Sequence, residues 1–199
     1  MKRATDLMLP RCLAASAILF CVAVPLQAQT PAAAPAPVAA APSTPPRAPI
    51  WKTYTYSSDG FSILFPSDPD IQKNSVPTAA GAFELRAYLV TPGSAALYVG
   101  VCDYGQAAAG RDPQAVLTGA KEGAVGNVKA HILTENKITL GIYPGVSFEA
   151  ENDTMHFSAR IYLVGTTLYQ TLTAAPLNDR YSDSVRFMDS FALIPRIKN

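Results

Sequence analysis

Short stretches in which apolar and polar residues alternate fill most of the sequence from Trp51 to Asn199, and this period of two constrains the fold most strongly. A strand that buries one face and exposes the other has this period, because successive side chains point to opposite sides of a sheet. The pattern predicts six to eight strands, which fall within residues 51–56, 61–65, 82–90, 94–104, 128–140, 146–153, 155–165 and 168–174.

The links between several of these stretches are short and rich in turn-forming residues. Residues 59–60 (Asp-Gly), 91–94 and 165–167 each predict a hairpin turn between two alternating stretches. Residues 141–145 predict a further turn, because their two glycines permit positive φ. Strands joined by such short links pair antiparallel, so the sheet is expected to be mostly antiparallel.

Two segments carry a helical pattern instead. Asp112 is a capping residue ahead of a proline, and it predicts a helix over residues 113–123. Near the end of the chain, residues 179–191 place apolar side chains at helical spacing, namely Tyr181, Val185, Met188 and Phe191. Helices that lie outside runs of hairpins favour an α+β domain over a parallel α/β sheet.

The first fifty residues have a different composition from the rest of the chain. A basic start, a thirteen-residue apolar run from Cys12 to Val24 and the small residue Ala28 predict a secretory signal peptide over residues 1–28. An uncleaved anchor is the alternative. Residues 29–50 are mainly Ala and Pro, which predicts a disordered linker. Residues 51–199 are then expected to form a single globular domain.

Charge and cysteine content exclude some classes of function. Loss of residues 1–28 takes three basic residues and one acidic residue from the sixteen and fifteen of the whole chain, which leaves a net charge of −1. A nearly neutral chain without a basic patch is not expected to bind nucleic acid. Cys102 would be the one remaining cysteine, so no internal disulfide is expected and the fold depends on its core.

Four tracts resemble the PsbP-like fold family, and the resemblance covers nearly all of residues 51–193. They are WKTY running into GFSILFPSDP, then GIYPGVSFEA, RIYLVGTTLYQTLTA and RFMDSFAL. The resemblance implies an antiparallel sheet with helices packed on both sides. It implies no reaction, because proteins of this fold serve largely as binding or assembly modules. The photosynthetic role of some members is not carried over, because the leader resembles a bacterial secretory signal.

No catalytic motif was found: the sequence has no G-x-S-x-G elbow, no P-loop and no H-E-x-x-H. The two histidines, His131 and His156, lie within predicted strands and are interpreted as structural residues. Cys102 is interpreted as a core residue, because a reactive thiol needs a histidine or a cation nearby. We therefore predict no catalytic, cofactor-binding or metal-binding residue and no cofactor.

Two groups of carboxylates could form cation sites. Asp68 and Asp70 follow a predicted strand, but the regular ligand spacing of a calcium loop is missing, so they are interpreted as turn residues. Residues 149–153 place three carboxylates two residues apart, on one face of a strand: Glu149, Glu151 and Asp153. This row could bind a cation or a basic partner. It is interpreted instead as a solvated face, paired with Lys137 or Arg160.

These observations favour an exported, non-catalytic binding or assembly module of the bacterial cell envelope, located in the periplasm or secreted. The expected partner is an envelope protein, and membrane association is expected only if the signal is retained. Two alternatives remain. One is a hydrolase or metal-dependent enzyme in which Cys102, a histidine and carboxylates converge. The other is a small-ligand carrier with a cleft lined by tyrosines, among them Tyr54, Tyr56, Tyr88, Tyr98, Tyr143, Tyr162 and Tyr169.

Overall fold

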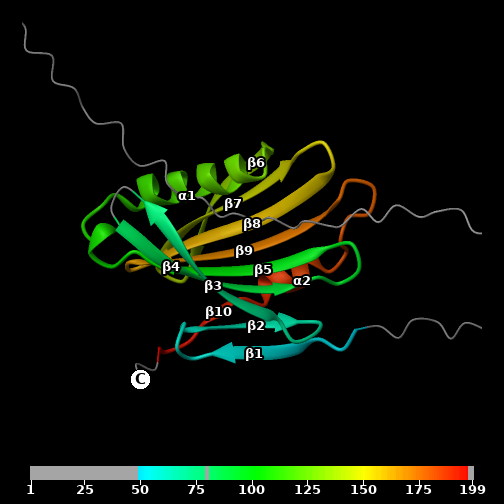
Figure 1. Cartoon of the computed structure of the whole chain (residues 1–199), viewed down its shortest axis with the longest axis horizontal. Helices are drawn as coiled ribbons and strands as arrows, with labels where there is room; N and C mark the ends of the chain where they lie inside the picture. The colour runs from blue at the N-terminus through cyan, green and yellow to red at the C-terminus, as the bar shows by residue number, and fades with distance from the viewer. Residues whose placement is uncertain (1–48, 79–80, 197–199) are drawn as a thin grey trace, which may run out of the picture.

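The computed structural model describes residues 49–78 and 81–196, and it shows an α+β fold built on two antiparallel sheets (Figure 1). The smaller sheet has the strand order β1-β2-β10. Its strands are β1 (Lys52–Tyr56), β2 (Phe61–Phe65) and β10 (Ala192–Leu193), so the two ends of the domain meet in one sheet. The hairpin predicted at residues 59–60 joins β1 and β2, as expected.

The larger sheet has seven strands in the order β3-β4-β5-β9-β8-β7-β6. Every neighbouring pair is antiparallel, as the short links predicted. The strands are β3 (Asp70–Thr78), β4 (Gly81–Val90), β5 (Ala96–Asp103), β6 (His131–Leu140), β7 (Tyr143–Glu151), β8 (Met155–Val164) and β9 (Thr167–Pro176). Because β5 pairs with β9, the edges of the sheet are β3 and β6.

Each face of the larger sheet carries its own core. Helix α1 (Pro113–Asn127) packs on one face over β7 and β8, where its Ala120 lies in a core with sheet residues such as Val146 and Ile161 (Figure 1). The smaller sheet and helix α2 (Ser184–Asp189) lie on the other face, around an aromatic core. That core contains Phe61, Phe65, Tyr88, Tyr162, Tyr169, Phe187 and Phe191. The prediction of helices on both sides is confirmed.

The turn predicted at residues 141–145 is shorter than expected. Only Gly141 and Ile142 form it, and β7 begins at Tyr143, so Pro144 and Gly145 lie inside a strand. Gly145 is opposite Tyr162, and a Cβ at Gly145 would lie 2.6 Å from the Tyr162 ring and 2.6 Å from the Ile161 carbonyl oxygen. Gly145 therefore leaves space for the Tyr162 ring on the neighbouring strand, rather than permitting a turn.

The two helices differ from their predicted forms. Helix α1 is four residues longer than expected and is capped by Asp112, whose side chain accepts a hydrogen bond from the Gln114 amide. Helix α2 has only six residues, so it is shorter than predicted, and Val185 is 65% exposed. The other three residues of the predicted stripe, Tyr181, Met188 and Phe191, do pack in the aromatic core. Phe187 and Met188 are the buried residues of this helix. In a helix of under two turns, the shape of the core determines which residues are buried more than the ideal helical period does.

Strand β3 was not predicted, and Asp70 begins this strand instead of belonging to a loop. Residues 70–75 are exposed, because β3 is an edge strand. A strand without a buried face needs no alternation, so its sequence carries no period-two signal. The predicted signal peptide (1–28) and most of the predicted linker (29–50) lie outside the described residues. No helix within the described ranges is long and apolar enough to cross a membrane.

Candidate functional site

Two clusters of polar side chains lie near opposite ends of the larger sheet. The first, here called the Asp59 cluster, comprises Asp59, Arg86, Tyr88, Tyr169 and Arg196. It begins at the β1–β2 turn, where the Asp59 and Gly60 amides both donate to the Tyr56 carbonyl, at 3.0 and 2.8 Å. Gly60 has φ +75, a conformation that glycine adopts without strain. This turn places Asp59 over strands β4 and β9 of the larger sheet.

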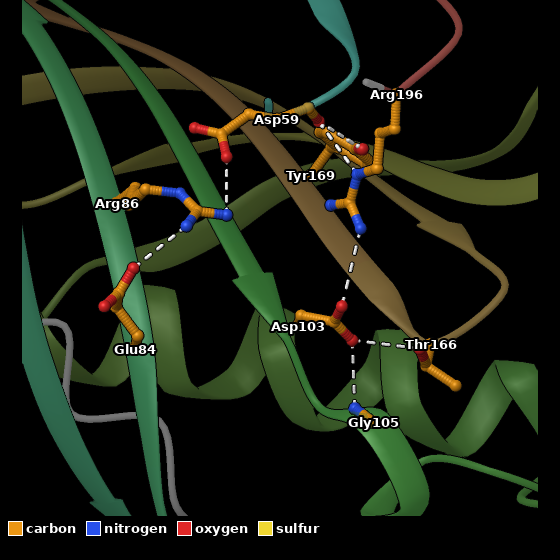
Figure 2. A network of polar contacts seen from close by, with 8 residues as sticks. All are labelled: Asp59, Glu84, Arg86, Asp103, Gly105, Thr166, Tyr169 and Arg196. Atoms are coloured by element: carbon orange, nitrogen blue, oxygen red, sulfur yellow. Dashed lines mark hydrogen bonds and ion pairs between the residues drawn. The ribbon is translucent and has the colours of Figure 1, made fainter. Parts of the chain in front are cut away.

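The carboxylate of Asp59 is fully enclosed and paired. Its side chain is 1% exposed, and Arg86 Nη2 approaches Oδ1 to 2.5 Å (Figure 2). The contact is an ion pair rather than an aligned hydrogen bond. The Tyr88 hydroxyl donates to Oδ2. Burial, and then this hydrogen bond to Asp59, raise the pKa of Tyr88. A buried carboxylate is tolerated only when it is paired in this way.

The same turn is also held through its main chain. The Asp59 carbonyl accepts a hydrogen bond from the Tyr169 hydroxyl at 2.6 Å and from Arg196 Nε at 3.3 Å (Figure 2). Arg196 also forms an ion pair with Asp103, whose carboxylate lies 3.4 Å from Nη1. Burial opposes ionisation of Asp103, but the Gly105 amide, the Thr166 hydroxyl and Arg196 outweigh it and lower its pKa. These contacts fasten the smaller sheet to the larger one.

The second group, here called the His156 cluster, comprises Glu149 and Glu151 on β7, His156 and Ser158 on β8, and Arg180 in the segment before α2. His156 Nε2 lies 2.6 Å from Glu149 Oε2, and Nδ1 lies 3.0 Å from Glu151 Oε1. Arg180 Nη2 reaches the same Glu151 oxygen at 2.8 Å. His156 and Tyr162 share a strand face, so the cluster lies on the side of the sheet that carries the aromatic core.

The arrangement fixes the imidazole ring but does not form a metal site. The two carboxylates contact opposite nitrogens of His156, so they cannot share one ion with it. Among the described residues, no group of three His, Cys, Asp or Glu side chains is placed to hold a metal ion. A neutral imidazole has one N–H, so donation to both carboxylates requires the charged imidazolium. The cluster is a charged surface whose side chains are already paired with one another.

The hydroxyl of Ser158 does not complete a catalytic triad. It donates to Glu149 Oε2 at 2.6 Å, and the same carboxylate oxygen contacts His156. In a Ser-His-Asp triad the histidine lies between the nucleophile and the carboxylate, because it must accept the proton of the serine. Here the carboxylate lies between the serine and the histidine, so His156 is not placed to accept that proton.

Cys102 and the histidines do not converge. Cys102 is buried on β5, opposite Leu168, which is opposite Leu163 of β8. His156 is seven residues from Leu163 along β8, a separation of roughly 23 Å at the usual rise of a strand. His131 begins the edge strand β6. Burial raises the pKa of the Cys102 thiol to about 11, as expected for a core residue.

The row of three carboxylates is present only in part. Glu149 and Glu151 share a face, but β7 ends at Glu151 and Asp153 lies in the following bend. The pairing predicted with Lys137 or Arg160 is wrong: His156, Ser158 and Arg180 are the partners. Lys137 is opposite Val146 on the other face of the sheet, and Arg160 binds Asp189 at 2.7 Å. The error arose because a register cannot be read from one strand alone.

The remaining candidates have structural positions. Asp68 accepts a hydrogen bond from the Tyr54 hydroxyl at 2.6 Å, and Asp70 accepts one from Gln72. A cavity of about 50 Å³ lies between α1 and the sheet, near Tyr98, Phe157 and Leu172. Ligand pockets are typically several times larger. Three of the tyrosines proposed for a cleft fill the aromatic core instead, namely Tyr88, Tyr162 and Tyr169.

The sequence drew no attention to Asp59 or Arg180. Asp59 was interpreted as an ordinary residue of an Asp-Gly turn, and only its burial against Arg86 marks it as special. Arg180 lies outside the strands in a polar segment. The available signal was the alternation of β4, because Arg86 occupies a position of the same face as Tyr88 and Val90. A charged residue on the buried face of a strand predicts a buried partner.

Two antiparallel sheets with helices on both faces of the larger one define a PsbP-like α+β fold. No protein-family model matches the chain, and no curated protein matches its sequence. Among solved structures, the solution structure of cyanobacterial PsbP (CyanoP) from Synechocystis sp. PCC 6803 is similar, with a TM-score of 0.51 and 11% sequence identity. The match covers 75% of this chain and 96% of that one. At this identity the similarity shows the fold alone, and it confirms the fold expected from the sequence.

Proposed function

We propose that this protein is an exported, non-catalytic binding or assembly module of the bacterial cell envelope, and that the His156 cluster is its contact surface. The observation that carries the proposal is the fixed geometry of this cluster on the surface. The Glu149 and Arg180 side chains are 41% and 63% exposed, yet Glu149 is held by its contact with His156 and Arg180 by its ion pair with Glu151. The leader and the PsbP-like fold are consistent with this role.

A surface whose charges are already oriented suits binding better than a set of free side chains. Ordering a long charged side chain on binding costs about 0.5–1.5 kcal/mol, and contacts within the cluster have met part of that cost. The cluster presents a carboxylate and a guanidinium side by side. It therefore fits a protein surface with complementary charges of both signs, where charge pairing sets orientation and the rate of association.

The two alternative functions have less support. A thiol or serine enzyme would need its nucleophile beside a base, and neither Cys102 nor Ser158 is placed so. A ligand carrier would need a larger hollow than the cavity of about 50 Å³ beneath α1. A binding surface requires neither of these.

The proposal is tested by affinity capture from envelope extracts, with the full chain as bait. We expect a specific partner for the wild type, at least tenfold less for R180E, and unchanged capture for R111E. Arg111 is an exposed arginine whose side chain donates a hydrogen bond to the Ala107 carbonyl and lies outside the His156 cluster, so R111E controls for net charge. Absence of a specific partner, or equal loss with both variants, would count against the proposal.

Export is tested separately by mass spectrometry of the mature N-terminus. Cleavage after Ala28 predicts a protein that begins at Gln29. An exported protein that still begins at Met1 would show that the leader is retained as an anchor. A chain found only in the cytoplasm would contradict the proposed location.

A further inference from the structure

The edge strand β6 exposes more apolar surface than its position in the sheet requires. Residues 131–137 of this strand are all exposed. Three of the seven large apolar side chains that are exposed in the described residues belong to β6 or to the turn that follows it: Ile132, Leu133 and Ile142. Ile142, at the tip of the turn, is 88% exposed.

The two edges of the larger sheet differ in their protection against pairing. Strand β3 contains Pro77, which has no N–H to donate, so a second strand cannot form a complete ladder along it. Strand β6 has no proline over its ten residues, and its one irregularity lies near its start, between Ile132 and Thr134. An exposed strand of this length is a template for another strand.

We propose that β6 is a dimer interface, in which two copies of this chain pair antiparallel about a twofold axis at Asn136. The proposal is independent of the His156 cluster. Charge complementarity argues for a second copy as the occupant. With Asn136 opposite itself, Glu135 of each copy lies opposite Lys137 of the other, and Thr134 lies opposite Ile138. Opposite charges directly across an antiparallel pair stabilise it, and like charges destabilise it.

The side chains fit this register in direction as well as in charge. Glu135 is opposite Phe148 and Lys137 is opposite Val146 on β7, and both of those residues belong to the core beneath α1. Glu135 and Lys137 therefore point to the same face of the sheet, where Lys121 of α1 already lies 2.7 Å from Glu135. In the described part of the chain Lys137 has no ion pair, so it is available to the partner copy.

Apolar contacts flank the charged centre of the proposed interface. Beyond the paired residues 134–138, Ile132 and Leu133 of one copy come beside Thr139 and Leu140 of the other. The exposed side chain of Ile142 then approaches the start of β6 in the partner copy. An isologous interface of this kind closes on itself, so it yields a dimer and not a fibre.

The interface is small, so we expect a weak and concentration-dependent dimer. Pairing through one strand per copy buries less than the roughly 1,200 Å² of a standard interface. A dissociation constant on the order of 10 μM is consistent with that size. Sedimentation velocity of the full chain from about 1 μM to 1 mM should therefore show a shift from monomer to dimer.

Charge variants test the register. K137E places Glu135 opposite another glutamate, and E135K places Lys137 opposite a lysine, so each alone should weaken the dimer roughly tenfold or more. An equimolar mixture restores opposite charges at both positions, and it should dimerise about as well as the wild type. K73E makes the same charge change on the exposed face of β3 and should leave the dimer unaffected.

Cysteine variants test the position of the axis. Antiparallel partners have Cα atoms 4.5–5.5 Å apart, within the range of a disulfide. N136C should therefore cross-link to itself under mild oxidation. T134C should not, because the two Thr134 residues would lie offset by four residues, or about 14 Å. Equal cross-linking of the two variants would overturn the register.

Other results would overturn the dimer itself. A monomer at every concentration, with circular dichroism of a folded protein, would exclude self-association and leave β6 to a strand from another protein. A dimer that tolerates K137E and E135K equally well would place the interface elsewhere. Neither result depends on whether a partner binds the His156 cluster, so this proposal and the proposed function can fail separately.

Discussion

The Asp59 cluster and the His156 cluster are both built around a carboxylate and a cation, but they differ in burial. Asp59 is enclosed between the two sheets, where its charge has lost contact with water. The His156 cluster lies at the surface, where water shares in solvating Glu149 and Arg180. A buried pair is costly to break, whereas an exposed pair contributes at most about 1 kcal/mol.

This difference indicates different roles. The Asp59 cluster bonds residues of the β1–β2 turn, β4, β9 and the C-terminal segment to one another, so it holds the smaller sheet in place. The His156 cluster joins two neighbouring strands and one following segment, which the sheet already positions. The Asp59 cluster stabilises the fold, whereas residues of the His156 cluster can be substituted without loss of the fold.

The largest effect is expected from R86M. This change leaves the Asp59 carboxylate buried with only the Tyr88 hydroxyl as a side-chain partner, and an uncompensated buried charge costs about 3–5 kcal/mol. The free energy of unfolding should fall by about 3 kcal/mol in urea. R160M is the matched control, because its partner Asp189 is largely exposed, and it should cost less than about 1 kcal/mol.

A second substitution separates charge from packing at this site. D59N in the R86M background removes the buried charge and keeps a side chain of the same shape, so it should recover part of the lost stability. If R86M lowers the free energy of unfolding by no more than R160M does, the buried ion pair does not hold the smaller sheet in place as its geometry indicates. If D59N fails to rescue R86M, the loss comes from packing of the arginine stem.

Alkaline pH should weaken the packing of buried tyrosines, including those near Asp59. Burial raises the pKa of Tyr56 to about 12, and burial and Asp59 raise the pKa of Tyr88. A group whose folded pKa is raised stabilises the fold below its unfolded pKa, near 10 for tyrosine, and loses that contribution as the pH rises further. Stability should therefore fall between pH 10 and pH 12.

The tyrosine responsible is identified by substitution. In Y56F the decline in thermal stability above pH 10 should be shallower, because this ring can no longer ionise. Y143F is the control, since Tyr143 lies away from the aromatic core on β7. Equal declines in the wild type, Y56F and Y143F would show that ionisation of Tyr56 does not control unfolding in this range.

A smaller effect is expected from Y169F. It removes one hydrogen bond, from the Tyr169 hydroxyl to the Asp59 carbonyl, and leaves the ring in the aromatic core. A buried hydrogen bond contributes about 1 kcal/mol, and Arg196 still donates to the same carbonyl. We expect a loss of about 1 kcal/mol in urea unfolding. A loss of unfolding free energy as large as that of R86M would mean that the hydrogen bond to the Asp59 carbonyl contributes as much to the stability of the turn as the ion pair does.

Much of the fold was predictable because alternation and turn residues are local signals. Eight of the ten strands fall wholly or largely in the predicted stretches, and Asp112 with Pro113 marked the start of α1. The exceptions are elements that lack a buried face or a full period. Strand β3 is an exposed edge, β10 has only two residues, and α2 covers only part of the segment that was predicted to be helical. Their positions depend on the rest of the sheet.

The polar clusters were not predictable because each depends on pairing between distant segments. Asp59 and Arg86 are 27 residues apart in sequence, and nothing near either residue indicates the other. Glu149 and Glu151 were recognised as a charged face, but their partners follow from the β7–β8 register and from Arg180. Sequence patterns predict which face a side chain occupies, and the register determines what it meets.

The smallest effect on stability is expected in the His156 cluster, from E149Q. Glutamine keeps the size of Glu149 and can still accept the Ser158 hydrogen bond, but it removes one carboxylate from His156. Because Glu149 is 41% exposed, the free energy of unfolding should change by less than about 1 kcal/mol. Partner capture should nevertheless fall with E149Q as it does with R180E. A stable variant that loses binding would separate the two clusters, whereas a loss of stability comparable to that of R86M would show that both serve the fold.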